Sequence, residues 1–300
     1  MKVAIASGKG GTGKTTVAVN LAQVVPRPVQ LLDCDVEEPN CSLFLAPEIE
    51  ESEKIGIPIP CVDETKCNAC GDCGNFCEFN AIISLGAAPL VFPELCHGCG
   101  GCAKVCPTGA ISEVDRPIGV VEKGRAGGIG FIQGRLNVGE AMAPPLIAAV
   151  KDRADTDGIT IIDSPPGTSC PVIETVRDCD IVVLVTEPTP FGLADLVLAV
   201  GAVREMGLPF GVVVNRAGVG DNRVSDYCRS EDIPVFLEIP NDRRVAEAYS
   251  RGKTIVEVVP ELTPAFEALW GRIVDHCKGA GIASEQALSG GVGANSRGGM

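Results

Sequence analysis

The stretch Gly8-Lys9-Gly10-Gly11-Thr12-Gly13-Lys14-Thr15 decides the fold of this 300-residue chain. It follows the pattern G-x-x-x-x-G-K-[ST] and stands between a strand-like run at residues 2–6 and a helix-like run at residues 14–25. Glycines at this spacing let backbone N–H groups close around phosphate oxygens, and the positive end of the following helix favours an anion. In such a loop Lys14 contacts the β- and γ-phosphates and Thr15 binds Mg²⁺. The sequence therefore predicts a loop at residues 8–16, Thr16 included, that binds ATP or ADP with Mg²⁺.

Outside this loop, short apolar runs alternate with helical stretches. This alternation indicates an α/β fold with a mainly parallel sheet and helices on both faces. Strands are expected at residues 29–33, 159–163, 181–186, 210–215 and 235–239, and helices near 171–178, 191–206, 221–230, 242–251 and 264–277.

Polar residues follow several of these strands. Asp33 and Asp35 end the second strand, and Asp163 ends the apolar run Ile159–Ile162. Ligands bind at the carboxyl ends of parallel strands, and an apolar strand that ends in Asp is the Walker B arrangement, which places a carboxylate on a water of Mg²⁺. Asp163 is thus a candidate for this role, whereas a solvated strand-end turn is the alternative interpretation of Asp33 and Asp35. Two further strand ends carry Asn215-Arg216 and Pro240-Asn241-Asp242.

Residues 61–110 have a different composition, with nine cysteines and little periodicity. Eight of these cysteines form two runs that are offset by about 29 residues, and both runs have the spacing C-x2-C-x2-C-x3-C. The bacterial ferredoxin pattern has the same spacing and a proline after the last cysteine. The second run, which is followed by Pro107, resembles this pattern at every position, whereas the first run has Glu78 in place of the proline. In ferredoxin-like folds three cysteines of one run share a [4Fe–4S] cluster with the last cysteine of the other run. The resemblance implies one cluster on Cys67, Cys70, Cys73 and Cys106, and a second on Cys96, Cys99, Cys102 and Cys77.

Zinc is the alternative, because C-x2-C is also a zinc spacing. Four-cysteine zinc sites usually combine two C-x2-C units, so the third and fourth cysteine of each run favour clusters. In a reducing compartment, fifteen cysteines indicate metal or redox chemistry rather than a disulfide framework. The run at residues 2–6 leads directly into the glycine-rich loop and leaves no room for a secretion signal. A cytoplasmic protein is therefore expected.

The stretch Lys9–Thr15 resembles the deviant Walker A loop of the MinD/ParA/Mrp family and of the nitrogenase iron protein, and Asp163-Ser-Pro-Pro-Gly167 resembles the second switch of Mrp and MinD. The resemblance implies an ATP-dependent homodimer in which Lys9 reaches the phosphates of the partner. It also implies that Asp35 orients the attacking water and acts on Mg²⁺ through water, while Asp33 supports Mg²⁺ waters or the loop. Lys9, Lys14, Asp35 and Asp163 are the expected catalytic residues. Adenine contacts are implied for Asn215, Arg216, Pro240, Asn241 and Asp242.

Cys170 lies seven residues after Asp163, at the offset of a cysteine that binds the dimer-bridging cluster of the nitrogenase iron protein. A bridging metal site at Cys170 is one interpretation, and a structural or reactive thiol is the other. The whole layout resembles MinD-superfamily ATPases with an inserted ferredoxin domain. The resemblance covers residues 1–278 and implies an ATPase domain at residues 1–60 and 111–278 with an α+β insertion at 61–110. The glycine-rich composition of residues 279–300 predicts a flexible tail.

Three functions are compatible with this layout. The first is an ATPase that couples nucleotide turnover to electron transfer to a redox or iron–sulfur acceptor protein. The second is an Mrp-like carrier of iron–sulfur clusters, and the third is a positioning protein of the MinD or ParA kind. The formal charge of −14 argues against a nucleic-acid binder, and no run approaches the roughly 18 apolar residues of a membrane span.

Overall fold

The computed structural model describes residues 1–279. Nine strands form the central sheet, in the order β11-β10-β9-β1-β8-β2-β7-β6-β3. These strands are β1 (Lys2–Ala6), β2 (Val29–Asp33), β3 (Glu48–Val62), β6 (Ile111–Ala126), β7 (Ile129–Leu136), β8 (Ile159–Asp163), β9 (Ile181–Thr186), β10 (Phe210–Ala217) and β11 (Val235–Pro240). Neighbours from β11 to β7 are parallel, whereas β6 pairs antiparallel with both β7 and β3. The expected mainly parallel α/β sheet is confirmed.

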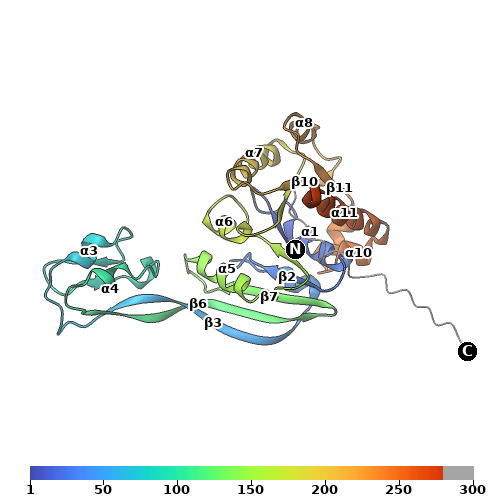
Figure 1. Cartoon of the computed structure of the whole chain (residues 1–300). Coiled ribbons are helices and arrows are strands. Elements are labelled where there is room, and N and C mark those ends of the chain that lie inside the picture. The colour runs from blue at the N-terminus through green and yellow to red at the C-terminus, as the bar shows by residue number, and fades with distance from the viewer. Residues whose placement is uncertain (280–300) are drawn as a thin grey trace, which may run out of the picture.

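Helices cover both faces of this sheet (Figure 1). Adjacent side chains of a strand point to opposite faces, so Ile161 and Ile162 of β8 belong to two different cores. The core that contains Ile161 lies under α1 and α11, and the core that contains Ile162 lies under α5 and α7. The longer helices are α1 (Lys14–Val24), α5 (Ala143–Asp152), α7 (Pro190–Glu205), α8 (Arg223–Ser230), α9 (Arg243–Ser250) and α11 (Thr263–Gly279).

Short elements complete the fold. They are the helices α2 (Cys41–Leu45), α3 (Asp72–Phe76), α4 (Gly101–Val105), α6 (Cys170–Val176) and α10 (Ile255–Val258), the 3₁₀ turns Pro93–Leu95 and Pro260–Leu262, and a separate two-stranded sheet of β4 (Ile82–Ile83) and β5 (Leu90–Val91). None of the helices within residues 1–279 combines the length and the apolar composition that crossing a membrane requires.

A long antiparallel ribbon of β3 and β6 carries the cysteine-rich segment away from the main body (Figure 1). Its strands span 15 and 16 residues, and Val62 pairs with Ile111 where the ribbon meets that segment. The first two residues of the expected insertion, Cys61 and Val62, therefore belong to β3. Gly279, expected to open the tail, ends α11, and residues 280–300 lie outside the described part of the chain.

Candidate nucleotide site and cysteine cavities

The phosphate loop joins β1 to α1 at the centre of the sheet, as its sequence predicts. Gly13 has φ of +98° at the start of α1, and a Cβ on this residue would collide with the side-chain amide of Asn215. Only glycine meets both conditions without strain. The Asn215 amide donates to the carbonyl of Thr12 over 2.8 Å, so the end of β10 holds the loop from the side.

Asp163 and Thr15 lie together beside this loop. The Thr15 hydroxyl donates to Oδ2 of Asp163 over 2.6 Å, and Asp163 is fully buried at the end of β8. Its other oxygen, Oδ1, is buried with no hydrogen-bond partner, and burial raises the pKa of this carboxyl. Thr12 Oγ1 is a second buried atom without a partner. A divalent cation and phosphate oxygens would complete both groups, so the donor set fits Mg²⁺ with a nucleotide.

Asp33 lies next to Asp163 because β2 and β8 pair in register at these two residues. Its carboxylate accepts backbone N–H groups of Asn40 and Cys41 at 3.0 and 2.9 Å, and of Asp35 at 3.2 Å. Burial, and then the charge of Asp163, raise the pKa of Asp33 to about 8. Asp33 thus closes the turn that follows β2, and its expected role toward Mg²⁺ waters or the loop stays a prediction.

Asp35 is partly exposed just beyond this turn. Burial, and then the charge of Asp163, raise its pKa to about 7, while Lys14 opposes this shift. A carboxyl that changes protonation near neutral pH beside Lys14 has the properties of a group that orients or activates water. The structure thus places Asp35 near Lys14 and Asp163, and its role toward water stays a prediction.

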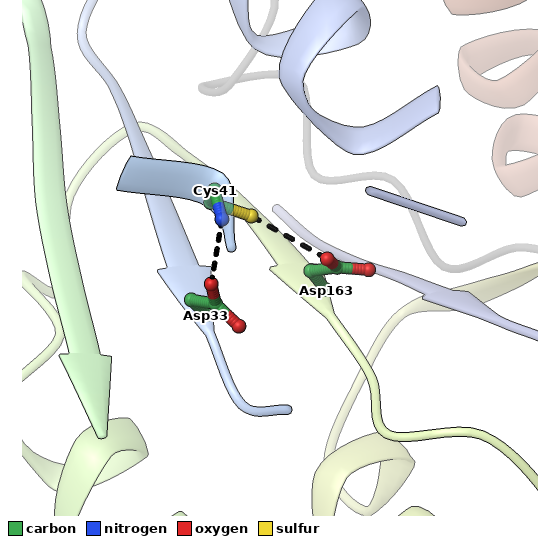
Figure 2. Close-up of side chains that lie close together, drawn as sticks. All are labelled: Asp33, Cys41 and Asp163. Atoms are coloured by element: carbon green, nitrogen blue, oxygen red, sulfur yellow. Dashed lines mark hydrogen bonds between the residues drawn. The ribbon is translucent and has the colours of Figure 1, made fainter. Parts of the chain in front are cut away.

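Cys41 is a member of the site that the sequence analysis did not include. Its thiol donates to Oδ2 of Asp163 over 3.4 Å, and Figure 2 shows it between Asp33 and Asp163. Burial and the two neighbouring carboxylates raise its pKa well above the ordinary value, so the thiol stays protonated. Its position at the start of α2, where Asp33 holds the backbone, could not be read from spacing alone.

Lys9 and Arg216 both meet Glu187, another residue that the sequence analysis left out. The ion pairs span 3.9 Å from Lys9 and 2.9 Å from Arg216. Glu187 directly follows the fully buried strand β9, so its place at the carboxyl edge of the sheet was a usable signal.

The remaining predicted nucleotide contacts lie at the end of β11. Asn241 donates its backbone N–H to the carbonyl of Ala217 over 3.0 Å and so stays close to β10. Asp242 instead caps α9 by accepting the N–H of Arg244 over 2.8 Å, and it forms an ion pair with the same residue. Its carboxylate is thus occupied by the helix start. Cys170 is exposed as the first residue of α6.

The cysteine-rich segment repeats its own backbone after 29 residues. Positive φ values occur at Ala69 and Gly98, at Gly71 and Gly100, and at Asn80 and Gly109. The same offset relates two hydrogen bonds, in which the N–H of Ala81 donates to Cys77 Sγ and that of Ala110 donates to Cys106 Sγ, both over 3.3 Å. The two cysteine runs therefore fold as two copies of one unit.

Each of two cavities in this segment is lined by four cysteines. We call the first the aromatic cavity, because Phe76 and Phe79 lie in its wall, and its cysteines are Cys77, Cys96, Cys99 and Cys102. The second, the small cavity, is lined by Cys67, Cys70, Cys73 and Cys106. The structure thus brings together the two sets of four that the ferredoxin resemblance implies.

No three sulfur atoms of either cavity lie as close together as a single zinc ion would hold them. A tetrahedral zinc with Zn–S bonds of about 2.3 Å holds its sulfurs about 3.8 Å apart. Within residues 1–279, one group of three or more Cys, His, Asp or Glu side chains has its ligand atoms within 4.8 Å of one another. That group is Asp33, Cys41 and Asp163, outside both cavities. Backbone N–H groups that donate to Cys77, Cys96 and Cys106 also match the way proteins support iron–sulfur clusters. The donor set therefore fits two iron–sulfur clusters.

Comparison with known proteins identifies relatives along most of the chain. Residues 3–255 match the family described as the CobQ/CobB/MinD/ParA nucleotide binding domain. An uncharacterized protein of Methanocaldococcus jannaschii is 30% identical over 268 residues, which cover 86% of this chain and 92% of that protein. An iron–sulfur cluster carrier protein of Pyrococcus horikoshii is 26% identical over 292 residues, which cover 89% of this chain and 82% of that protein.

Solved structures share the fold at low identity. The septum site-determining protein MinD of Pyrococcus horikoshii, complexed with Mg-ADP, has a TM-score of 0.54 and 20% identity, and the match covers 95% of this chain and 99% of that one. The cell division ATPase MinD of Pyrococcus furiosus has a TM-score of 0.55 and 21% identity, with 91% of this chain and 98% of that one covered.

Proposed function

The chain belongs to the CobQ/CobB/MinD/ParA family of nucleotide-binding domains and has the fold of its MinD-type P-loop ATPases; from this premise we propose that it couples ATP binding and hydrolysis to electron transfer through two [4Fe–4S] clusters. The observation that carries the proposal is the pair of four-cysteine cavities at the end of a ribbon that is continuous with the nucleotide-binding sheet. The protein would act as an ATP-dependent homodimer in the cytoplasm.

In the nucleotide site, each residue has a task that follows from its position. The loop amides and Lys14 hold the phosphates of ATP, and Thr15 with Asp163 would hold Mg²⁺, which neutralises charge on the β- and γ-phosphates when bound. Asp35 orients the water that attacks the γ-phosphate, and Lys14 keeps a share of this carboxyl ionised near neutral pH. Lys9 would leave Glu187 and contact phosphates across the dimer.

The contacts that follow Asp35 suggest how the nucleotide state reaches the cysteine cavities. Asp33 and Asp163 fix the turn after β2, and the chain then passes through α2 into β3. The same turn also contacts the other strand of the ribbon indirectly. The carbonyl of Val36 accepts the N–H of Leu136, the last residue of β7, and β7 pairs with β6. Movement of residues 34–36 would therefore reach both strands of the ribbon.

The cysteines of the two cavities would hold the clusters, which supply one-electron transfer when bound. The chain itself shapes this chemistry through the N–H donors to Cys77, Cys96 and Cys106. In the small cavity, the pKa of Cys106 is lowered, and the main cause is its hydrogen bond with the Thr108 side chain. A lower pKa favours the thiolate, which is the form that binds iron.

Anaerobic purification followed by iron and sulfide analysis tests this proposal. We expect about eight iron and eight sulfide per chain, as two [4Fe–4S] clusters require, together with Mg²⁺-dependent ATP hydrolysis. A preparation without inorganic sulfide, or without ATP binding, would rule out the proposed function.

A second candidate is a carrier that delivers clusters to other proteins, which the names of relatives such as the Pyrococcus horikoshii protein favour. The two functions differ in what leaves the protein. Iron-57 label that moves to an apo-protein on addition of ATP would favour the carrier, whereas label that stays bound while electrons are transferred favours the redox ATPase.

Cys170 is exposed beside the second switch, so it could bind a third metal site between the two subunits of the proposed dimer. Comparing the iron content of Cys170→Ser with that of the unchanged protein in the ATP-bound dimer decides this point, because a bridging cluster would be lost and a simple thiol would leave the iron content unchanged.

A further inference from the structure

The two cysteine cavities have the same backbone but different walls. The aromatic cavity encloses about 340 Å³ and the small cavity about 10 Å³. The small cavity is walled by short side chains such as Asn68, Ser84 and Thr108. Pro58 and Pro60 of the ribbon form part of the aromatic cavity, together with Phe76 and Phe79. One copy of the repeat is thus walled mainly by short side chains and the other by large apolar ones, although each copy leaves one cysteine exposed, Cys70 in the first and Cys99 in the second.

The mouth of the aromatic cavity exposes large apolar groups to solvent. Phe76 and Phe79 are 48% and 44% exposed, and the ring of His97 stacks on Phe79 with 3.6 Å between centroids. The repeat itself does not require these rings, because the positions 29 residues later hold Val105 and Thr108. Exposed aromatic side chains around a pocket are typical of sites where another protein binds.

The charge around this mouth is negative. Glu78 and Glu113 line the cavity and are exposed. Residues 63–110 contain five acidic and two basic residues, a formal charge of −3. A [4Fe–4S] cluster with four thiolates would add further negative charge. A second copy of this chain would be repelled here, whereas a protein with lysines and arginines around an apolar face would be attracted.

We propose that the mouth of the aromatic cavity is the docking site of an electron-acceptor protein whose binding face has an apolar centre and a rim of basic residues. This inference rests on the proposed function and adds the face of the molecule where the acceptor binds. Cys77, Cys96, Cys99 and Cys102 would hold the cluster, which would supply one electron to a one-electron oxidant on the docked protein, with no bond formed or broken. Phe76 and Phe79 supply the apolar contact, and Glu78 and Glu113 pair with the basic rim.

Cytochrome c, a basic haem protein, is a suitable probe. Its affinity for the anaerobic, iron-loaded protein is measured by calorimetry at low salt with both proteins oxidised, so the readout does not depend on turnover. We expect Phe79→Ser to weaken binding about tenfold, as the loss of a central apolar contact does. Glu113→Gln should weaken it about threefold and reduce its salt dependence.

Two variants serve as matched controls in the main body and on the ribbon. Phe191 is 78% exposed on α7, and Glu51 is exposed on β3. Phe191→Ser and Glu51→Gln should leave the affinity unchanged. The affinity of Phe79→Ser is measured on protein whose iron and sulfide content equals that of the unchanged protein, so that a loss of clusters is not mistaken for a loss of docking.

The outcomes separate the two levels of the proposal. The docking site is overturned if the iron-loaded protein does not bind cytochrome c, or if Phe79→Ser binds it as tightly as the unchanged protein does. It is also overturned if only the control variants bind more weakly. Each of these results leaves the proposed function intact. Chain–chain association that Phe79→Ser abolishes would assign the mouth to a second copy instead. Protein prepared anaerobically without iron and sulfide would overturn both.

Discussion

The ATPase body and the cysteine segment keep their shapes by different means. Two hydrophobic cores of 29 buried residues each support the body, whereas the core of the cysteine segment has three, Cys73, Ile82 and Ile111. So few buried side chains cannot offset the entropy of ordering about 48 residues. We therefore expect the body to fold before its ligand arrives, and the cysteine segment to fold only with the proposed clusters.

Removing the clusters is the strongest way to break this comparison. Iron chelation under reducing, anaerobic conditions should unfold residues 63–110, because metal-binding free energy is there folding free energy. Proteolysis within that segment should accelerate by about 100-fold or more, since cleavage follows the population of the open form. ATP affinity should change little. Equal protease resistance with and without iron would show that the segment folds without clusters.

Lys14→Ala probes the opposite region. Loss of the cation at the phosphates should lower ATP hydrolysis by about 10²–10³-fold, by analogy with the removal of other groups that stabilise transition-state charge. Iron and sulfide content should remain at the level of the unchanged protein. Iron loss in this variant would mean that the cysteine segment depends on the nucleotide site for its fold.

Asp35→Asn sharpens the account of the nucleotide site. Hydrolysis should fall by about 10²-fold while nucleotide binding remains, because positioning of water contributes to the chemical step. In the unchanged protein, single-turnover hydrolysis should rise with pH around 7, where the raised pKa of Asp35 lies. The Asn variant should lose this rise, and a variant that keeps it would assign the titration to another group.

Cys102→Ser tests whether the two cavities act as separate sites. The aromatic cavity would lose a ligand while the small cavity keeps four, so iron should fall from about eight to about four per chain. Cys179→Ser is the matched control, since Cys179 is buried in the core of the body and lines neither cysteine cavity. Complete iron loss in Cys102→Ser would instead mean that the two sites assemble together.

The smallest expected effect concerns stability and pH. Asp33 is protonated more readily in the folded chain than in the unfolded one, because its pKa rises from 3.8 to about 8. Between these values the folded state binds more protons, so the stability of the nucleotide-free protein should decrease as pH rises from about 4 to 8. Asp33→Asn should flatten this slope in thermal unfolding curves. An unchanged slope would contradict the placement of the titration at Asp33.

The parts of the molecule that the sequence predicted are those with a local signal. Periodicity and spacing predicted the glycine loop, the apolar strands β1, β2, β8, β9, β10 and β11, and the helices α1, α6, α7, α8, α9 and α11. The ribbon does not, because residues 48–54 of β3 are mostly exposed and charged and two prolines follow. Strands β6 and β7 and helix α5 were likewise not predicted. A strand that is held only by pairing with its neighbour, with neither face buried, shows no alternation of apolar and polar residues from which it could be predicted.

The site shows the same division. Asp33, Asp163 and Thr15 were found because each stands at a predicted strand end or helix start. Cys41 was missed because the backbone turn held by Asp33, and not a motif, carries it to Asp163. For Asp242, the sequence alone did not reveal that a helix cap and Arg244 occupy its carboxylate.

The central claim is that the nucleotide site and the cysteine cavities sense each other's state. Potentiometric titration of the iron–sulfur signals, with and without Mg²⁺-ATP, measures this coupling directly, since a ligand that distinguishes two states must shift the equilibrium between them. The account predicts that ATP shifts at least one midpoint potential in the unchanged protein and none in Lys14→Ala. Identical potentials with and without ATP in the unchanged protein would contradict it.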